Sequence, residues 1–399
     1  MAHFTINQYL DEVSNAWNSR NNVKLSNVLS LRHAHALSSK LQIPAGTREV
    51  ERLRLSPLDE VVVAHLRVIW ALNVPDYAEA YRCQSALVLT FARMLQSCRD
   101  DNWLLKAMFT VCLDLRLLAI QADKHNSSKG FGKSIEALEK AAECLMACFR
   151  VCAADNRASN EDTKKWGMMS LVNQLFKVYF GINKLNLCKP LIRAIDSSPL
   201  KDRFPVSQQV TYRYYVGRKA MFDSNYKSAG DYLTYAFERC HKQSKRNKRL
   251  ILIYLVPIKM ILGYMPQRNL LEKYDLLQFW DLVQGVQSGD VRRLNVAMQH
   301  HQKFFVQCGI YLLLEKLKVI AYRNLFKKVY LLLRTHQIPM DALLCALRMM
   351  DIEDIDLAET QCIVANLIYE GKIKGYISHQ HQKLVVSKQN PFPPLSSLE

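Results

Sequence analysis

The chain has 399 residues, of which 49% are apolar, enough for about two or three domains with sizeable cores. Its 13 Gly and 12 Pro are too few for an architecture built from many hairpins, so a mostly helical protein is expected. The 54 Lys and Arg residues exceed the 36 acidic residues and give a formal charge of +18, which attracts polyanions but also describes an ordinary solvated basic surface.

Cysteines and apolar stretches exclude further classes of protein. The 11 cysteines include no Cys-x-x-Cys pair, which favours free thiols in a reduced intracellular protein. Acidic residues interrupt the segment Met1 to Val13 where a signal peptide needs a continuous apolar stretch. The longest apolar stretch, Leu250 to Ile258, is far shorter than the ~20 residues of a membrane-spanning helix. We therefore expect neither secretion nor a membrane segment.

Helical periodicity begins near Thr5 and recurs in amphipathic segments joined by short turns. Residues 20–49 are less regular, and residues 123–133 are expected to form a polar linker that contains glycine. The strongest periodic segments before the repeat-like unit are 58–72, 77–97, 102–122, 134–153, 161–180 and 187–195. Paired helices of this kind predict an irregular α-solenoid.

One helix pair has the signature of a tetratricopeptide-type repeat. Gly217, Ala229, Leu233 and Ala236 occupy its small and apolar positions, where small residues let two helices pack closely. The unit is followed by six cations without an acid among them, here named the repeat-turn cluster. Four interpretations of this cluster compete: contact with RNA, docking of an acidic partner, nuclear import through residues 245–249, and a mobile solvated loop. The repeat-turn cluster consists of Arg239, Lys242, Lys245, Arg246, Lys248 and Arg249.

Residues 310–394 predict a winged helix. A first long helix is expected from Ile310 to about Arg334, and a second over 340–349. Asp356 and Glu359 form a capping box that starts a third helix near residue 357.

Gly371 should end the third helix, after which two β-prone runs over 372–378 and 383–387 form a hairpin.

Cations recur along the first helix of this segment at spacings of seven, four and seven residues, which places them on one helical face. Together with cations of the hairpin they predict a patch that binds phosphates, against the alternative of a solvated face. Arg323 could instead be a structural strut. The basic stripe consists of Lys316, Arg323, Lys327 and Arg334, with Lys328 beside it; the wing cations are Lys372, Lys374, His379, His381 and Lys383.

The third helix argues against sequence-specific reading of DNA. A recognition helix in the major groove needs Arg, Lys, Asn or Gln side chains that reach the base edges. Residues 357–370 contain no Lys or Arg and include Glu359 and Glu370, which phosphates would repel.

Apparent catalytic and metal motifs are weak. The run 132–134 imitates the end of a phosphate loop, but Ser127 stands where the first glycine should be. Cys144, Cys148 and Cys152 share one helix face and are expected in the core rather than around zinc. The pairs His300-His301 and His379-x-His381 lack further ligands. We therefore expect no enzyme, no metal and no cofactor.

Several segments resemble the PCI domain, the module shared by the proteasome lid, the COP9 signalosome and a translation initiation factor. Residues 247–266 look like its helical half, and residues 322–327 and 371–377 like its winged half. Four further segments are similar to the PCI subunit of the nuclear mRNA export complex built on the GANP/Sac3 scaffold. These segments are 166–168, 173–176, 188–194 and 380–395.

The resemblance implies a non-catalytic adaptor that couples transcription to mRNA export and is located in the nucleus, at nuclear pores. It leaves open whether the protein is also located in the cytoplasm. Its implied partners are a GANP/Sac3-type scaffold, a short acidic disordered subunit shared with the proteasome lid, and RNA or DNA without strong sequence preference. A subunit of a lid-like or signalosome-like assembly and a sequence-specific winged-helix transcription regulator are the alternatives.

The predicted domains follow this division: an N-terminal helical region over 1–132, helical repeats with the helical half of the PCI domain over 133–305, the winged helix over 306–388 and a tail over 389–399.

Overall fold

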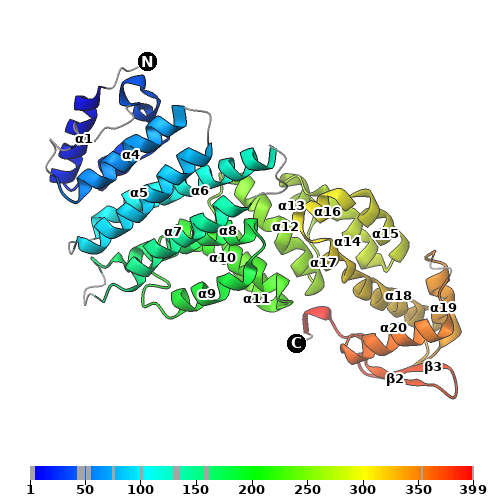
Figure 1. The fold of residues 1–399 in the computed structure, drawn as a ribbon. Helices are drawn as coiled ribbons and strands as arrows, with labels where there is room; N and C mark the ends of the chain where they lie inside the picture. Colours follow the sequence, from blue (N-terminus) through cyan, green and yellow to red (C-terminus); the bar gives the residue numbers. More distant parts are fainter. Residues whose placement is uncertain are drawn as a thin grey trace. The chain divides into compact units, whose positions relative to one another are not determined.

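The computed structural model describes residues 5–42, 50, 55–73, 77–98, 102–128, 135–156, 161–351 and 354–397 (Figure 1). Its fold is the one predicted, helical repeats followed by a winged helix at the C-terminal end. Internal contacts group the chain into two units, Met1–Tyr215 and Val216–Glu399. The finer boundaries after residues 132, 305 and 388 stay predictions.

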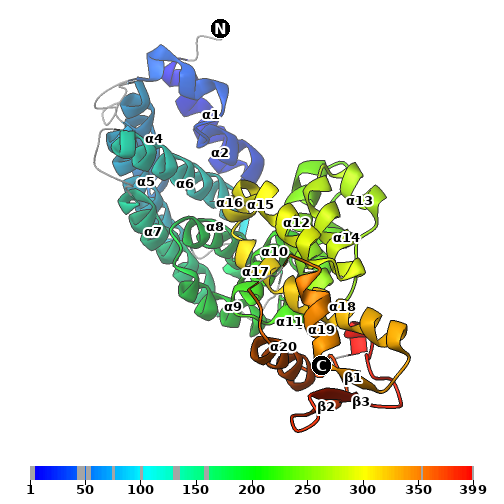
Figure 2. The same cartoon turned by 90° about the vertical axis from the view of Figure 1, so that its right-hand side faces the viewer.

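The first unit consists of successive helices that pack side by side. Helix α5 contacts α4, α6 and α7, while α7 contacts α5, α6 and α8, so α5 and α7 form one layer and α6 and α8 another (Figure 2). Apolar residues at helical spacing form the buried core of these helices, among them Phe91, Leu115 and Phe176. The helices are α1 (Ile6–Asn18), α2 (Asn22–Val28), α4 (Leu58–Asn73), α5 (Tyr77–Ser97), α6 (Leu105–Ser128), α7 (Glu136–Ala153), α8 (Met168–Gly181) and α9 (Cys188–Asp196).

The predicted polar linker over 123–133 is wrong for its first half. Helix α6 continues to Ser128, because the polar residues of its last turns lie on a helix surface rather than in a loop. Asp123, one of these polar residues, is buried, and its carboxylate accepts hydrogen bonds of 3.0 Å from the backbone N–H groups of Ala137 and Leu138. It thereby caps the amino end of α7.

The second unit begins with the predicted repeat-like pair. Helix α10 (Val206–Phe222) enters it and packs closely on α11 (Tyr226–Arg239), where Ala229, Leu233 and Ala236 are fully buried. A Cβ added at Gly217 would lie 2.7 Å from Leu233 Cγ, so the small residue is required by the close approach of the two helices. The following helices are α12 (Lys245–Ile261), α13 (Arg268–Lys273), α14 (Trp280–Ser288), α15 (Val291–His300), α16 (Gln302–Cys308) and α17 (Tyr311–Glu315).

Residues 317–351 and 354–386, as the structure describes them, form a winged helix of three helices and a three-stranded sheet. Its core includes Phe326 of the first helix, Leu343 of the second and Leu367 of the third, packed on Leu384 of the sheet. The capping box of Asp356 and Glu359 is present as predicted. Gly371 follows the third helix with a φ of 69°. The elements are α18 (Leu317–Leu333), β1 (Gln337–Pro339), α19 (Met340–Arg348), α20 (Leu357–Tyr369), β2 (Gly375–Ser378) and β3 (Lys383–Val386).

The sheet has the order β1-β3-β2, with both neighbouring pairs antiparallel. The predicted hairpin supplies β2 and β3, in which Ser378 lies opposite Lys383. Strand β1 was not predicted, because its three residues are too few to show alternation and Pro339 suits only an edge strand.

The first helix of the winged helix is interrupted, contrary to the prediction of one helix from Ile310 to Arg334. At Lys316 the backbone hydrogen bonds tighten to an i→i−3 pattern, with Lys316 N–H donating to the carbonyl of Leu313 and Val319 N–H to that of Lys316. This separates α17 from α18. Among the described helices, none combines the length and apolar character needed to cross a bilayer.

Candidate nucleic-acid interface

Helix α18 is held on the turn that follows α14. The side-chain amide of Asn324 donates a hydrogen bond of 2.7 Å to the carbonyl of Val286. A Cβ at Gly289 would lie 2.5 Å from Leu325 N, and its φ of 70° is left-handed, so glycine is needed there on both grounds. One side of α18 is therefore committed to packing.

Arg323 lies on that packed side, and its predicted contact with phosphates is wrong. Only 6% of the residue is exposed, because its Nη2 donates hydrogen bonds to the carbonyl oxygens of Phe392 (3.0 Å) and Pro393 (2.7 Å). Burial lowers the pKa of the guanidinium, as expected for a desolvated cation. Arg323 is a strut, the alternative that the sequence left open, and it holds the C-terminal tail on α18.

Two further members of the basic stripe also depart from it. Lys316 lies at the helix break, and its ammonium donates a hydrogen bond of 2.7 Å to the hydroxyl of Tyr226 on α11. Arg334 is exposed but has a φ of 49°, so it ends α18 in the left-handed conformation. The prediction of a single continuous stripe of four cations is thus wrong, because it assumed an unbroken helix with one face exposed along its whole length.

Three cations remain exposed at the carboxyl end of α18: Lys327, Lys328 and Arg334. The exposed leucines 331–333 lie among them.

The wing cations differ in accessibility. Lys372 is paired with Glu370 and is half-buried, so its charge is largely neutralised. Lys374 is exposed before β2, and Lys383 on β3 donates a hydrogen bond of 3.3 Å to the side-chain carbonyl of Gln337. His379 and His381 are exposed in the turn between β2 and β3.

One exposed aromatic on the wing was missed by the sequence reasoning. Tyr376 lies opposite Val385, and Ser378 lies opposite Lys383, so these side chains share one face of the sheet. Leu384 and Val386 are buried on the other face, while Tyr376 is 63% exposed. The alternation of β2 and β3 could have shown that Tyr376 and Lys383 share the face of the sheet opposite to the buried one.

Helix α20 has no Lys or Arg, and its exposed residues include Glu359 and Tyr369. The local arrangement therefore agrees with the argument against base reading in a major groove.

The repeat-turn cluster is not one mobile loop. Helix α12 begins at Lys245, and Lys248 is buried, with its ammonium donating a hydrogen bond of 2.8 Å to the carbonyl of Phe237. Arg249 forms an ion pair with Asp275. An import signal over 245–249 would need these residues exposed, which the folded helix prevents for Lys248. Four cations stay exposed: Arg239, Lys242, Lys245 and Arg246.

The catalytic and metal motifs are explained by packing where the structure describes them. Cys144, Cys148 and Cys152 are buried on α7, as predicted, and all 11 cysteines are free thiols. Burial raises the pKa of Cys144 to about 11, which leaves it protonated and unreactive. In the described ranges no three His, Cys, Asp or Glu side chains are placed to hold a metal ion, His300 and His301 included. The run 132–134 lies outside the described residues.

Comparison with known proteins decides the family. The PCI domain model matches residues 297–388. PCI domain-containing protein 2 of Danio rerio is 57% identical over 398 residues, covering 100% of both chains. The homolog of that protein in Drosophila melanogaster is 55% identical, covering 98% of this chain and 99% of its own. The chain belongs to the PCI domain family.

The PCI match begins in α15 and ends after β3, so it contains every candidate cation of the winged helix and none of the repeat-turn cluster. A more distant PCI relative, the protein CSN12 homolog of Neurospora crassa, is 32% identical and covers 73% of each chain. The predicted PCI resemblance is thus confirmed.

Proposed function

We propose that this chain is a non-catalytic PCI subunit of a nuclear mRNA export complex that holds RNA by its backbone. The observation that carries the RNA contact is a set of cations on the winged helix: exposed Lys327, Lys328 and Arg334 on α18, with exposed Lys374 and half-buried Lys383 on the wing. Cations without acidic partners attract phosphates regardless of base sequence.

Exposed Tyr376 supports RNA over duplex DNA. It shares a face of the sheet with Lys383, and a tyrosine beside a cation lets an unpaired base stack while its phosphate is neutralised. Helix α20, which carries Glu359 and no Lys or Arg, supports binding without base-specific readout in a major groove.

The proposed partners are a GANP/Sac3-type scaffold and a short acidic disordered subunit. The resemblance over residues 166–168, 173–176, 188–194 and 380–395 supports the scaffold, and the net charge of +18 supports an acidic ligand that gains from electrostatic steering. Location at nuclear pores follows from the same assignment. A role without turnover follows from the family, whose members assemble multi-subunit complexes.

The alternative is a subunit of a signalosome-like assembly, which the relative named as a CSN12 homolog favours. Purification of the endogenous complex followed by mass spectrometry separates the two. Co-purification of an export scaffold with the acidic subunit is expected, whereas recovery of signalosome subunits without that scaffold would refute the export assignment.

A further inference from the structure

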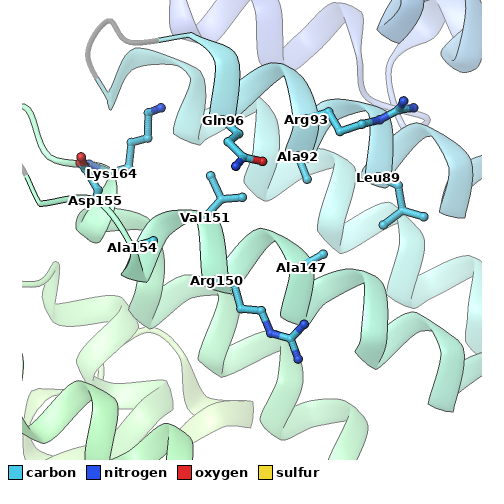
Figure 3. A pocket seen from close by; sticks show the side chains of 10 residues that line it. All are labelled: Leu89, Ala92, Arg93, Gln96, Ala147, Arg150, Val151, Ala154, Asp155 and Lys164. Atoms are coloured by element: carbon cyan, nitrogen blue, oxygen red, sulfur yellow. The ribbon is translucent and has the colours of Figure 1, made fainter.

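A groove with an apolar floor lies between α5 and α7, far along the chain from the PCI match. Its volume is about 830 Å³, within the range of pockets that bind ligands. Figure 3 shows Leu89 and Ala92 on the α5 side and Ala147 and Val151 on the α7 side. Leu89 is 42% exposed, so part of this floor contacts water.

Two arginines flank the floor, one from each helix. Arg93 lies one turn after Leu89 on α5, and Arg150 lies one turn after Ala147 on α7 (Figure 3). Both are exposed, and neither guanidinium has an acidic partner among the residues that the structure describes. The side chain of Arg93 runs along α5, and that of Arg150 extends from α7 on the side away from α5, so the two cations stand at opposite edges of the groove (Figure 3).

Asp155, the acidic residue that lines the groove, already has hydrogen-bond partners. The carboxylate of Asp155 accepts hydrogen bonds from the hydroxyl of Thr163 (2.8 Å) and the backbone N–H of Lys164 (2.6 Å). The buried ammonium of Lys164 donates to the carbonyls of Leu95 and Cys98 at the end of α5. Neither group neutralises Arg93 or Arg150, so the groove favours a negatively charged occupant.

We propose that this groove docks an amphipathic helical segment of a partner protein whose apolar side chains are flanked by Asp or Glu. The lining residues recur at i, i+3, i+4 and i+7 along α7, which spans about 10 Å at 1.5 Å per residue and matches two turns of a bound helix. The apolar floor takes the partner's apolar side chains, and the two guanidinium groups take its carboxylates. RNA fits less well, because its phosphates would gain nothing from the apolar floor.

The probe is a fluorescein-labelled synthetic helix of about 18 residues, with Leu at i, i+3, i+4 and i+7 and Glu on both sides. Fluorescence anisotropy with the full chain is expected to show binding. Two matched peptides, one with Lys for Glu and one with Ser for Leu, should bind at least about tenfold more weakly. Hydrogen exchange should slow in α5 and α7 when the first peptide is bound.

The double variant Arg93→Glu with Arg150→Glu should lower affinity for the acidic peptide at least about tenfold. Lys106→Glu with Arg193→Glu makes the same change in net charge at exposed sites of the same unit and should leave affinity within about twofold. Because Glu at residue 150 weakens the carboxyl end of α7, Arg93→Gln with Arg150→Gln provides a gentler test with the same expected direction.

If the groove variant and the control variant lost affinity for the acidic peptide equally, the peptide would be binding through the overall charge of the chain. That result would overturn the proposal. Absence of peptide binding to the folded wild-type chain would overturn it too. So would a groove variant that loses affinity for oligouridine RNA but not for the peptide, since the groove would then bind nucleic acid.

Discussion

The guanidinium of Arg323 donates a hydrogen bond of 2.7 Å to the carbonyl oxygen of Pro393, across 70 residues of sequence. Because a second hydrogen bond reaches Phe392, the first helix of the winged helix holds the C-terminal tail in place. A residue expected to bind phosphate is thereby a structural part of the fold.

Replacement of Arg323 by Ala should lower the free energy of unfolding by about 3 kcal/mol, because it leaves two buried carbonyls without a donor. Arg323→Lys should recover only part of the loss, because a single ammonium has no second nitrogen to donate to Oδ1 of Asn324, as Nη1 of Arg323 does. Urea unfolding followed by circular dichroism measures both. Exposed Lys327→Ala is the control, with a change of about 0.5 kcal/mol or less. If Arg323→Ala lowered the free energy of unfolding as little as this control does, the structural role of Arg323 would be contradicted.

Reversal of two exposed cations tests the RNA surface. Lys327→Glu with Lys374→Glu should weaken binding to all single-stranded sequences and lower the log–log salt slope by about 1.4, since each phosphate contact contributes about 0.7. Electrophoretic shifts at several salt concentrations measure the slope. Lys24→Glu with Lys40→Glu, exposed cations of the first unit, should leave the slope unchanged. An unchanged slope in the first variant would mean that these lysines are only solvated.

Substitution of Tyr376 separates stacking from charge. Tyr376→Ala should reduce the affinity for single-stranded RNA by about 1 to 3 kcal/mol, because a stacked base loses its partner. The salt slope should stay the same, since no cation is removed, and Tyr376→Phe should keep most of the affinity. Anisotropy titrations at two salt concentrations distinguish this pattern from the one for the lysines. Equal affinity of wild type and Tyr376→Ala would exclude stacking at this site.

The amino end of α12 should gain stability from charge reversal. Lys245 and Arg246 lie in its first turn, where the helix dipole disfavours cations and no acid is present. Lys245→Glu with Arg246→Glu should therefore raise the free energy of unfolding by about 1 kcal/mol, visible as a higher Tm. The same variant should bind heparin less tightly if the repeat-turn cluster holds anions. A lower Tm would show that tertiary contacts outweigh the dipole.

Buried histidines in the first unit should make its stability depend on pH. Nε2 of His35 lies 3.2 Å from Nε2 of His65, with Tyr9 stacked on His35. Burial lowers the pKa of His65 to about 3 and that of His35 to about 4, from an ordinary value of 6.5. Below pH 6.5 the unfolded chain therefore binds protons that the folded chain excludes, and stability falls until the folded pKa values are reached.

The slope should approach about 2.7 kcal/mol per pH unit near pH 5, the value for two protons. Chemical unfolding at pH 7, 6 and 5 measures it, and His65→Phe should reduce it by about half. The exposed His381→Phe is the matched control, with no effect on the profile. If His65→Phe also left the slope unchanged, the buried pair would not control acid stability.

Features that depend on neighbours in sequence could be read from the chain itself. The capping box of Asp356 and Glu359 forms across three residues, and the left-handed Gly371 ends α20 where expected. The close packing at Gly217 and the core position of Cys148 followed from helical periodicity. In each case the partners lie within a few turns or one hairpin, so propensity and spacing were sufficient.

Only the tertiary structure decided which faces are covered. Spacing placed Arg323 and Lys327 on one helical face, but the tail from 69 residues later covers Arg323 and leaves Lys327 exposed. Lys316 contacts Tyr226 across 90 residues, and the groove with Arg93 and Arg150 arises where two helices of one layer meet. Periodicity determines which residues share a face, whereas long-range packing determines whether that face contacts solvent.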